Sequence, residues 1–268
     1  MTDDCGCTRH QKPEKATTGV IGLTNAFGGY LAFPCVRDRV APLLLGGRLE
    51  DYLTKEFMQF VYWMSKGQRF CEGNYGRKGE QRVDLAFMRD PKKWELDSDL
   101  PAGGRQGKVV EALIEAKYLH NRSRRGFDDN KRDEVRATLG DLARQLQLAP
   151  KQRHAGSRVA LRARSVRVYG LIFVAYIRNA AEVSTESAVE NRKDDFFNFV
   201  LKTAADFRLQ YHDLLKPALR PVYDDHTVRL FGEDWLVSMK SALWRLKEDP
   251  SIEPTEPLRE RKAGTEGS

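Results

Sequence analysis

The chain has 268 residues, of which 41% are hydrophobic and 31% are charged, which is typical of a globular protein able to bury a substantial core. No apolar run approaches the roughly 18 residues of a membrane helix, and the first residues lack the apolar segment of a signal peptide. We therefore expect a cytoplasmic protein with no membrane partner.

The formal net charge of +7 permits a polyanionic partner but does not identify one. Its distribution is more informative, because residues 120–132 and 151–167 form two basic stretches that flank the same part of the chain. They are interpreted either as phosphate-binding loops or as ordinary solvated loops.

The composition of the two ends of the chain predicts terminal tails. Residues 1–18 are polar, and residues 249–268 are rich in Pro, Glu and Gly, so we expect both to be flexible. Cys5, Cys7 and His10 lie in the first tail and lack the paired spacing of a zinc finger, which favours incidental thiols over a metal site. Between the tails we expect a single domain, residues 19–248, with a core at 48–177 and a helical C-terminal part at 186–248.

Residues 48–66 are predicted to form a helix, because apolar residues recur at helical spacing. Glu56 borders this apolar face, beside Tyr52, Phe60 and Trp63. The helix face is formed by Leu49, Leu53, Phe57, Phe60, Val61 and Met64.

A Gly-rich turn and then a strand are predicted next. In the strand from Gln81 to Met88, alternation places Asp84 on one face while Val83, Leu85 and Phe87 occupy the other. A polar loop, 91–107, leads to a second strand at 109–119.

The remaining elements complete an α/β fold with a mixed central β-sheet flanked by helices. A helix at 130–149 presents Val135, Leu139, Leu142 and Leu146 on one face, and the apolar residues 165–177 predict a strand buried on both faces. A long helix at 186–215, a short strand from His226 to Phe231 and a helix from Glu233 to Lys247 follow.

Glu115 and Lys117 interrupt the strand 109–119 and share one of its faces, since residues two apart point the same way. If Asp84 lies on a neighbouring strand, two carboxylates and an ammonium converge. Mg²⁺ binds oxygen ligands and needs few protein carboxylates, so Asp84, Glu115 and the Ala116 carbonyl are candidate ligands. Lys117 would orient or deprotonate a water, or neutralise developing charge.

Purely structural roles are the alternative interpretation of these residues. A half-exposed strand carrying a solvated ion pair would explain Glu115 and Lys117, and Glu56 would then simply reach solvent. Glu80 and Glu111 are alternative ligands on the same faces. His120 is more simply a surface histidine, and the acidic cluster Asp224, Asp225 and His226 is more simply a turn.

Asp84, followed by Glu115-Ala116-Lys117 on the next strand, resembles the signature of the PD-(D/E)XK nuclease superfamily. The resemblance covers about residues 48–177 and implies a restriction-endonuclease-like fold. Val83 stands where the signature has proline, and no tyrosine follows Gln145 as in the RecB-type subfamily.

The same resemblance implies roles for further residues. Glu56 matches a glutamate of the first helix that assists metal binding in many members. Backbone contacts to nucleic acid would come from the basic loop and the following helix, through Arg124, Arg125, Lys131, Arg136, Arg144 and Gln145.

The function expected from these residues is a Mg²⁺-dependent nuclease that cleaves DNA, with RNA as the alternative substrate and Mn²⁺ as a substitute metal. Dimerisation would supply two active centres for a double-strand cut. A non-catalytic nucleic-acid-binding or interaction protein of the same fold is the alternative. A nucleotide-dependent enzyme fits least, because the sequence carries neither G-x-x-x-x-G-K-[ST] nor a G-x-G-x-x-G after a strand.

Overall fold

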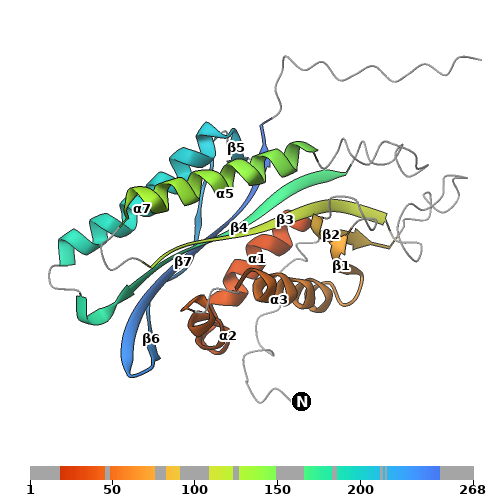
Figure 1. Cartoon of the computed structure of the whole chain (residues 1–268). Helices are drawn as coiled ribbons and strands as arrows, with labels where there is room; N and C mark the ends of the chain where they lie inside the picture. The colour runs from red at the N-terminus through yellow and green to blue at the C-terminus, as the bar shows by residue number, and fades with distance from the viewer. Residues whose placement is uncertain are drawn as a thin grey trace, which may run out of the picture.

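The computed structural model describes residues 19–45, 49–75, 83–90, 109–122, 127–148, 166–182, 186–211, 214 and 216–247. The fold is α/β, with a mixed, open, seven-stranded sheet between two layers of helices (Figure 1). No helix in this described part of the chain is long and apolar enough to cross a membrane. Both expected tails, with Cys5, Cys7 and His10, lie outside the described residues.

The sheet has the order β1-β2-β3-β4-β7-β5, and β6 pairs with the same edge of β7 as β5 does. The pair β3–β4 is parallel, whereas the other pairs of described strands are antiparallel. The strands are β1 Arg69–Tyr75, β2 Val83–Arg89, β3 Val109–Asn121, β4 Arg167–Asn179, β5 Leu209–Tyr211, β6 Arg220–Leu230 and β7 Glu233–Leu246.

Helices from the two halves of the chain cover opposite faces of the sheet (Figure 1). The first layer contains α1 Val20–Ala32, α2 Pro34–Val40, the 3₁₀ helix Ala41–Leu45 and α3 Leu49–Met64. The second contains α5 Asp129–Leu148 and α7 Glu186–Asp206. A short 3₁₀ turn, Ala180–Glu182, joins β4 to the segment before α7.

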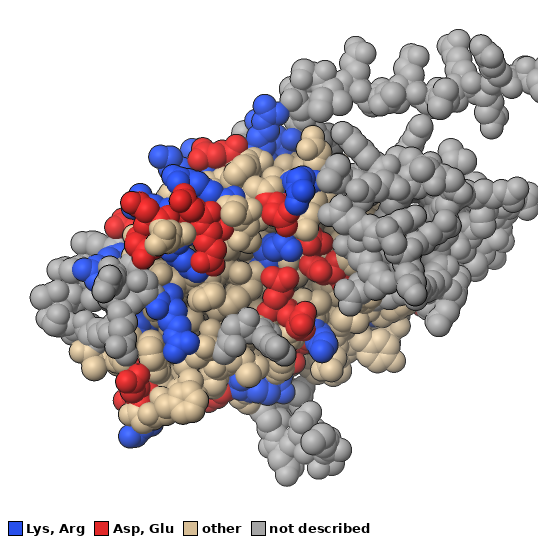
Figure 2. All heavy atoms as spheres, viewed as in Figure 1, with Lys and Arg blue, Asp and Glu red and all other residues tan. Residues whose placement is uncertain are grey.

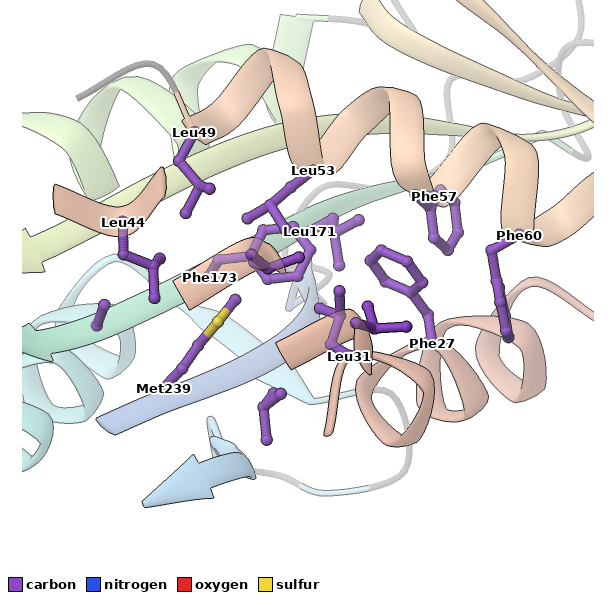
Figure 3. Close-up of a cluster of buried hydrophobic side chains, with 14 of the residues drawn as sticks. Phe27, Leu31, Leu44, Leu49, Leu53, Phe57, Phe60, Leu171, Phe173 and Met239 are labelled. Carbon is purple, nitrogen blue, oxygen red and sulfur yellow. The ribbon is translucent and has the colours of Figure 1, made fainter. Parts of the chain in front are cut away.

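The core under the first layer is aromatic. Phe27 of α1 packs edge-on against Phe57 of α3 and against Phe173 of β4, with ring centroids 5.1 and 6.1 Å apart (Figure 3). Leu53 and Met239 fill the space around these rings, and all five side chains are buried. Burying each side chain of this size contributes roughly 1.5–3 kcal/mol, so this cluster fixes α3 on the sheet.

The core under the second layer uses the helix face that the sequence predicts. Val135, Leu139, Leu142 and Leu146 are all buried, and they pack with side chains of β4 and α7. Gly170 of β4 lies directly under Leu142: a Cβ there would stand 2.8 Å from Leu142 Cδ2. The glycine therefore lets α5 approach the sheet closely.

Several predicted elements agree with the structure to within a few residues, namely those at 48–66, 81–88, 109–119, 130–149 and 165–177. Two of the predicted helices are wrong. The helix expected from Glu233 to Lys247 is strand β7, and the helix expected at 186–215 ends at Asp206. Arg208 then adopts a left-handed φ of 58° and turns the chain into β5.

Candidate active site

The candidate site lies where β2 separates from β3. The two strands pair from Arg89–Val109 to Leu85–Ile114. Beyond Leu85, the main-chain N–H of Ala116 donates to Asp84 Oδ2 at 2.8 Å, so a side-chain carboxylate occupies the position of a strand partner. A carboxylate held by a main-chain N–H is fixed in place and stays available through its second oxygen.

Helix α3 brings a second carboxylate to the same edge of β3. The N–H of Tyr118 donates to Glu50 Oε2 at 3.2 Å. Main-chain groups of residues two apart in a strand point to the same side, so Asp84 and Glu50 lie next to each other along β3. Glu50 was not predicted from the sequence.

Glu115 and Lys117 form a close ion pair in which Lys117 Nζ donates to Glu115 Oε1 at 2.9 Å. Glu115 is only 6% exposed, so the solvated ion pair does not describe it. Burial raises the pKa of the Glu115 carboxyl and repulsion from Asp84 raises it further, while Lys117 works in the opposite direction. Asp84 and Glu115 are therefore close enough to interact electrostatically.

The four groups form one electrostatic cluster. Burial raises the pKa of Glu50, and Asp84 adds to this rise although Lys117 opposes it. Burial alone would lower the pKa of Lys117, but attraction to Glu115, Glu50 and Asp84 outweighs it and raises that pKa. With every group ionised, three carboxylates and one ammonium leave a formal charge of −2 in a largely buried place, which costs free energy.

The donor set suits a hard divalent cation in chemical type. Asp84, Glu115 and Glu50 offer carboxylate oxygens, and the carbonyl of Ala116 faces the same edge as its N–H. A doubly positive ion would also neutralise the charge of the cluster. In the arrangement that the structure describes, one oxygen of each carboxylate accepts a hydrogen bond from an N–H or ammonium donor, and no described group of three or more Asp, Glu, His or Cys is arranged to hold a metal ion.

Glu56 is buried as well, but it has different partners. It accepts a hydrogen bond from Tyr30 at 2.9 Å and an ion pair from Arg39, which ties α3 to α1 and α2. Burial, together with the nearby Glu56 carboxylate, raises the pKa of Tyr30 to about 12. Six residues separate Glu56 from Glu50, about 9 Å along the helix. The structure therefore brings Glu50, and not Glu56, to the cluster.

Glu111 is held by two arginines. Arg69 Nε lies 3.3 Å and Arg89 Nε 3.0 Å from its two carboxylate oxygens. This pairing gives Glu111 a structural role between β1, β2 and β3. Glu80, the other alternative ligand, lies outside the described residues.

His120 is half-buried and stacks on Tyr118 with ring centroids 5.3 Å apart. Burial lowers its pKa, and the nearby Lys131 lowers it further. These surroundings describe a packed neutral histidine near the end of β3.

The acidic cluster of the C-terminal half lies in strand β6 instead of a turn. The pairing of β6 with β7 is irregular between Tyr223 and His226, and Asp225 has a left-handed φ of 42°. Burial opposes ionisation of Asp224, but hydrogen bonds from Ser238 and the buried Lys193 outweigh it and lower the pKa of Asp224. The cluster thus anchors α7 to the sheet.

The predicted nucleic-acid contacts fall into two groups. Arg124 and Arg125 lie outside the described residues, whereas four other residues lie on α5. There Lys131 pairs with Glu134, Arg136 with Asp133 and Arg144 with Asp141, and the Oε1 of Gln145 is buried without a hydrogen-bond partner. Figure 2 shows acidic and basic side chains intermixed over α5 and α7 on the viewed face, so the helix layer presents no continuous basic surface there.

Comparisons with protein-family models, with curated proteins and with solved structures find no match for this chain. The chemistry of the site therefore rests on its own residues and on their positions on β2, β3 and α3.

Proposed function

We propose that the chain is a Mg²⁺-dependent nuclease that hydrolyses DNA phosphodiester bonds, with Mn²⁺ as a substitute cation. The observation that carries the proposal is the convergence of Asp84, Glu115 and Lys117, joined by Glu50, at the edge where β2 leaves β3. Acidic side chains with raised pKa values that gather around one lysine are typical of functional sites.

The surrounding elements support a restriction-endonuclease-like core for this proposal. Their order is α3, the antiparallel strands β1, β2 and β3, the crossover helix α5, and β4 parallel to β3. This is the segment over which the sequence resembles the PD-(D/E)XK superfamily. The remaining elements, α7 to β7, extend the sheet away from the site (Figure 1).

In this proposal Asp84 and Glu115 hold the cation together with the Ala116 carbonyl, and Glu50 lies beside them. A bound Mg²⁺ supplies an activated water and stabilises negative charge on the phosphate. The main-chain N–H of Ala116 positions Asp84, and the N–H of Tyr118 positions Glu50. Both positioning groups belong to β3, so the geometry of the ligands follows that of one strand.

Lys117 acts as a positive charge in this proposal. Its raised pKa keeps the ammonium protonated at neutral pH, which suits the stabilisation of charge that develops on the phosphate and the orientation of a water. The buried Glu115 carboxylate fixes the ammonium through the 2.9 Å hydrogen bond. The alternative role of general base would require deprotonation, which the surrounding carboxylates oppose.

One observation favours the second candidate, a non-catalytic nucleic-acid-binding or interaction protein. One oxygen of each carboxylate, Asp84 Oδ2 and Glu115 Oε1, already accepts a hydrogen bond from a donor of the chain itself, as in a purely structural polar cluster. In that case Glu115→Gln and Lys117→Ala would leave nucleic-acid binding unchanged. Binding would then depend on basic residues such as Arg136 and Lys131, and each lost phosphate contact would reduce the salt dependence.

The deciding experiment incubates the full chain with plasmid DNA, linear DNA and RNA, in Mg²⁺ and in EDTA. Glu115→Gln is compared with Glu111→Gln, which removes a carboxylate from the same face of the same strand. We expect cleavage in Mg²⁺ alone, a loss of about 10²–10⁴-fold for Glu115→Gln, and near wild-type rates for Glu111→Gln. Cleavage in EDTA, or equal rates for wild type and Glu115→Gln, would contradict the proposal.

The outcome in which no substrate is cut also rejects the nuclease. Filter binding of the same DNA at several salt concentrations then tests the second candidate directly. Binding that survives Glu115→Gln and weakens on Arg136→Ala supports a non-catalytic protein.

A further inference from the structure

A cavity of about 280 Å³ lies at the edge of β7 that faces away from β4 and β3. Helix α1 forms one wall, and β5, β6 and β7 form the others. Its lining consists of Thr24, Asn25, Gly28, Gly29, Tyr211, Arg220, Pro221, Ser241, Ala242 and Leu243. In the sheet order, β4 separates β7 from β3, so β7 lies roughly 10 Å, two strand spacings, from the strand that carries Glu115, and the cavity lies beyond β7.

The cavity exists because two strands share one edge of β7 without meeting. β5 pairs with β7 up to Trp244, and β6 pairs with it up to Ser241. Neither of these strands pairs with Ala242 or Leu243, and this part of the β7 edge faces the cavity. The gap is thus a consequence of the topology.

The polar groups around the cavity are predominantly donors. Tyr211 donates its hydroxyl hydrogen to Asn25 Oδ1 at 2.9 Å, which leaves the amide N–H groups of Asn25 to donate elsewhere. Arg220 lies over the ring of Tyr211, 4.9 Å from its centroid, so the guanidinium is held at the cavity wall. Ser241 adds a hydroxyl. Among the described residues that line the cavity there is no carboxylate, and Arg220 gives this set a positive charge.

The two glycines of α1 keep this space open. A Cβ at Gly28 would stand 3.4 Å from Ser241 Oγ, so that wall is already in contact with β7. A Cβ at Gly29 would meet no atom within 4 Å, which means that the space beside Gly29 is open.

We propose that this cavity is a binding site for a small oxyanion, of the phosphate or carboxylate type, held by Arg220, Asn25 and Ser241. An arginine fork with neutral donors matches the oxygens of such an anion, and no carboxylate among the described lining residues competes for the guanidinium. The small volume favours a compact ligand. This site is independent of the proposed nuclease centre.

The test is calorimetric titration of the full chain, without divalent metal and at constant ionic strength. The probes are inorganic phosphate, adenosine 5′-monophosphate and succinate, which distinguish a free phosphate, a phosphomonoester and a dicarboxylate. We expect saturable one-site binding of at least one probe. Arg220→Gln should weaken it about tenfold or more, because charged hydrogen bonds contribute most to such sites.

A second variant and two controls accompany Arg220→Gln. Gly29→Leu fills the open space from an exposed helical position and favours the helix, so it should fold and abolish binding. Arg229→Gln removes the same charge from the other end of β6, and Lys117→Ala removes the cation of the nuclease centre. Both controls should change the affinity by less than about twofold.

Three results would overturn the proposal. The first is that none of the probes binds saturably. The second is that Arg229→Gln weakens binding as much as Arg220→Gln does, which indicates diffuse electrostatics. The third is that Lys117→Ala abolishes binding while Arg220→Gln and Gly29→Leu retain it.

Discussion

The carboxylate of Asp84 accepts the main-chain N–H of Ala116 at 2.8 Å, one residue beyond the last regular pair of β2 with β3. The same side chain therefore completes the hydrogen bonding of the sheet edge and presents charge beside Glu115. Because structure and proposed chemistry share this residue, variants at the site have to be chosen so that they separate the two roles.

Helix α3 offers such a separation, since the partly buried Glu50 and the buried Glu56 both lie on it but have different partners. We expect Glu50→Gln to reduce cleavage by about 10²-fold or more, because the proposed centre loses a charge. Glu56→Gln should leave cleavage unchanged and lower the free energy of unfolding by about 1–2 kcal/mol, since Tyr30 and Arg39 lose a charged partner. Cleavage rates and urea denaturation of both variants measure these effects.

The reverse pattern, cleavage lost in Glu56→Gln and kept in Glu50→Gln, would show that Glu56 is the glutamate of α3 that assists the proposed metal centre. It would also mean that the contact of Glu50 with Tyr118 serves only to close the edge of β3.

Stability should depend on pH through Glu50. Burial first, and repulsion from Asp84 in addition, raise its pKa above the usual 4.5, so the folded chain binds this proton more tightly than the unfolded chain. The stability of the metal-free protein therefore falls as the pH rises from about 4.5 through the raised pKa. Glutamine cannot ionise and still accepts the N–H of Tyr118.

Glu50→Gln should accordingly stabilise the metal-free protein at neutral pH, and its advantage should shrink as the pH falls toward 4.5. Urea denaturation of wild type and variant across this range measures the difference. An advantage that grows toward acid pH would show that Glu50 is stabilised as a carboxylate.

Divalent metal should stabilise the folded chain. A cation that binds the folded state alone raises the free energy of unfolding by about 2.7 kcal/mol at a hundredfold excess over its dissociation constant. We expect Mg²⁺ to raise the melting temperature of the wild type, EDTA to reverse the rise, and Asp84→Asn or Glu115→Gln to remove most of it. Glu111→Gln is the control with an unaltered centre, and an equal rise in all variants would indicate binding elsewhere.

Gly170 of β4 lies between the site and the second helix layer, since it pairs with Glu115 in the β3–β4 register and contacts Leu142 of α5. Gly170→Ala should destabilise the protein by about 1–3 kcal/mol, because its Cβ would overlap the buried side chain of Leu142. Gly29→Ala, at an exposed helical position with open space, should stabilise it by about 0.5–1 kcal/mol. Thermal denaturation compares the two, and equal effects would contradict the close approach of α5.

The residues of β3 illustrate what sequence can predict. Alternation within one strand is a local property, so Glu115 and Lys117 could be placed on one face without knowledge of the neighbours. The partnership with Asp84 required only that the two predicted strands be adjacent. Which glutamate of α3 reaches β3, Glu50 or Glu56, depends on how the helix lies across the sheet. That orientation is set by the packing of Phe27 against Phe57, for which the sequence carries no local signal.

The incorrect predictions for β7 and for the end of α7 also have physical causes. β7 is apolar on both faces, with Val237 and Met239 in one core and Ala242 and Trp244 in the other, so the alternation that marks a strand is absent. The end of α7 is fixed by the left-handed φ of Arg208, a conformation that sequence indicates only when glycine or asparagine adopts it. The N-terminal helices α1 and α2 and strand β1 were not predicted at all.

The register of β3 with β4 limits how the protein can be shortened. All residues of the proposed centre lie between Glu50 and Lys117, which suggests a fragment of modest length. However, β3 is paired along Ala112–Asn121 with β4, and β4 is paired in turn with β7 near the end of the described chain. A truncation after α5 would leave β3 with a bare, apolar edge and would invite aggregation. The smallest fragment that folds with the proposed centre intact is therefore expected to extend to Leu246.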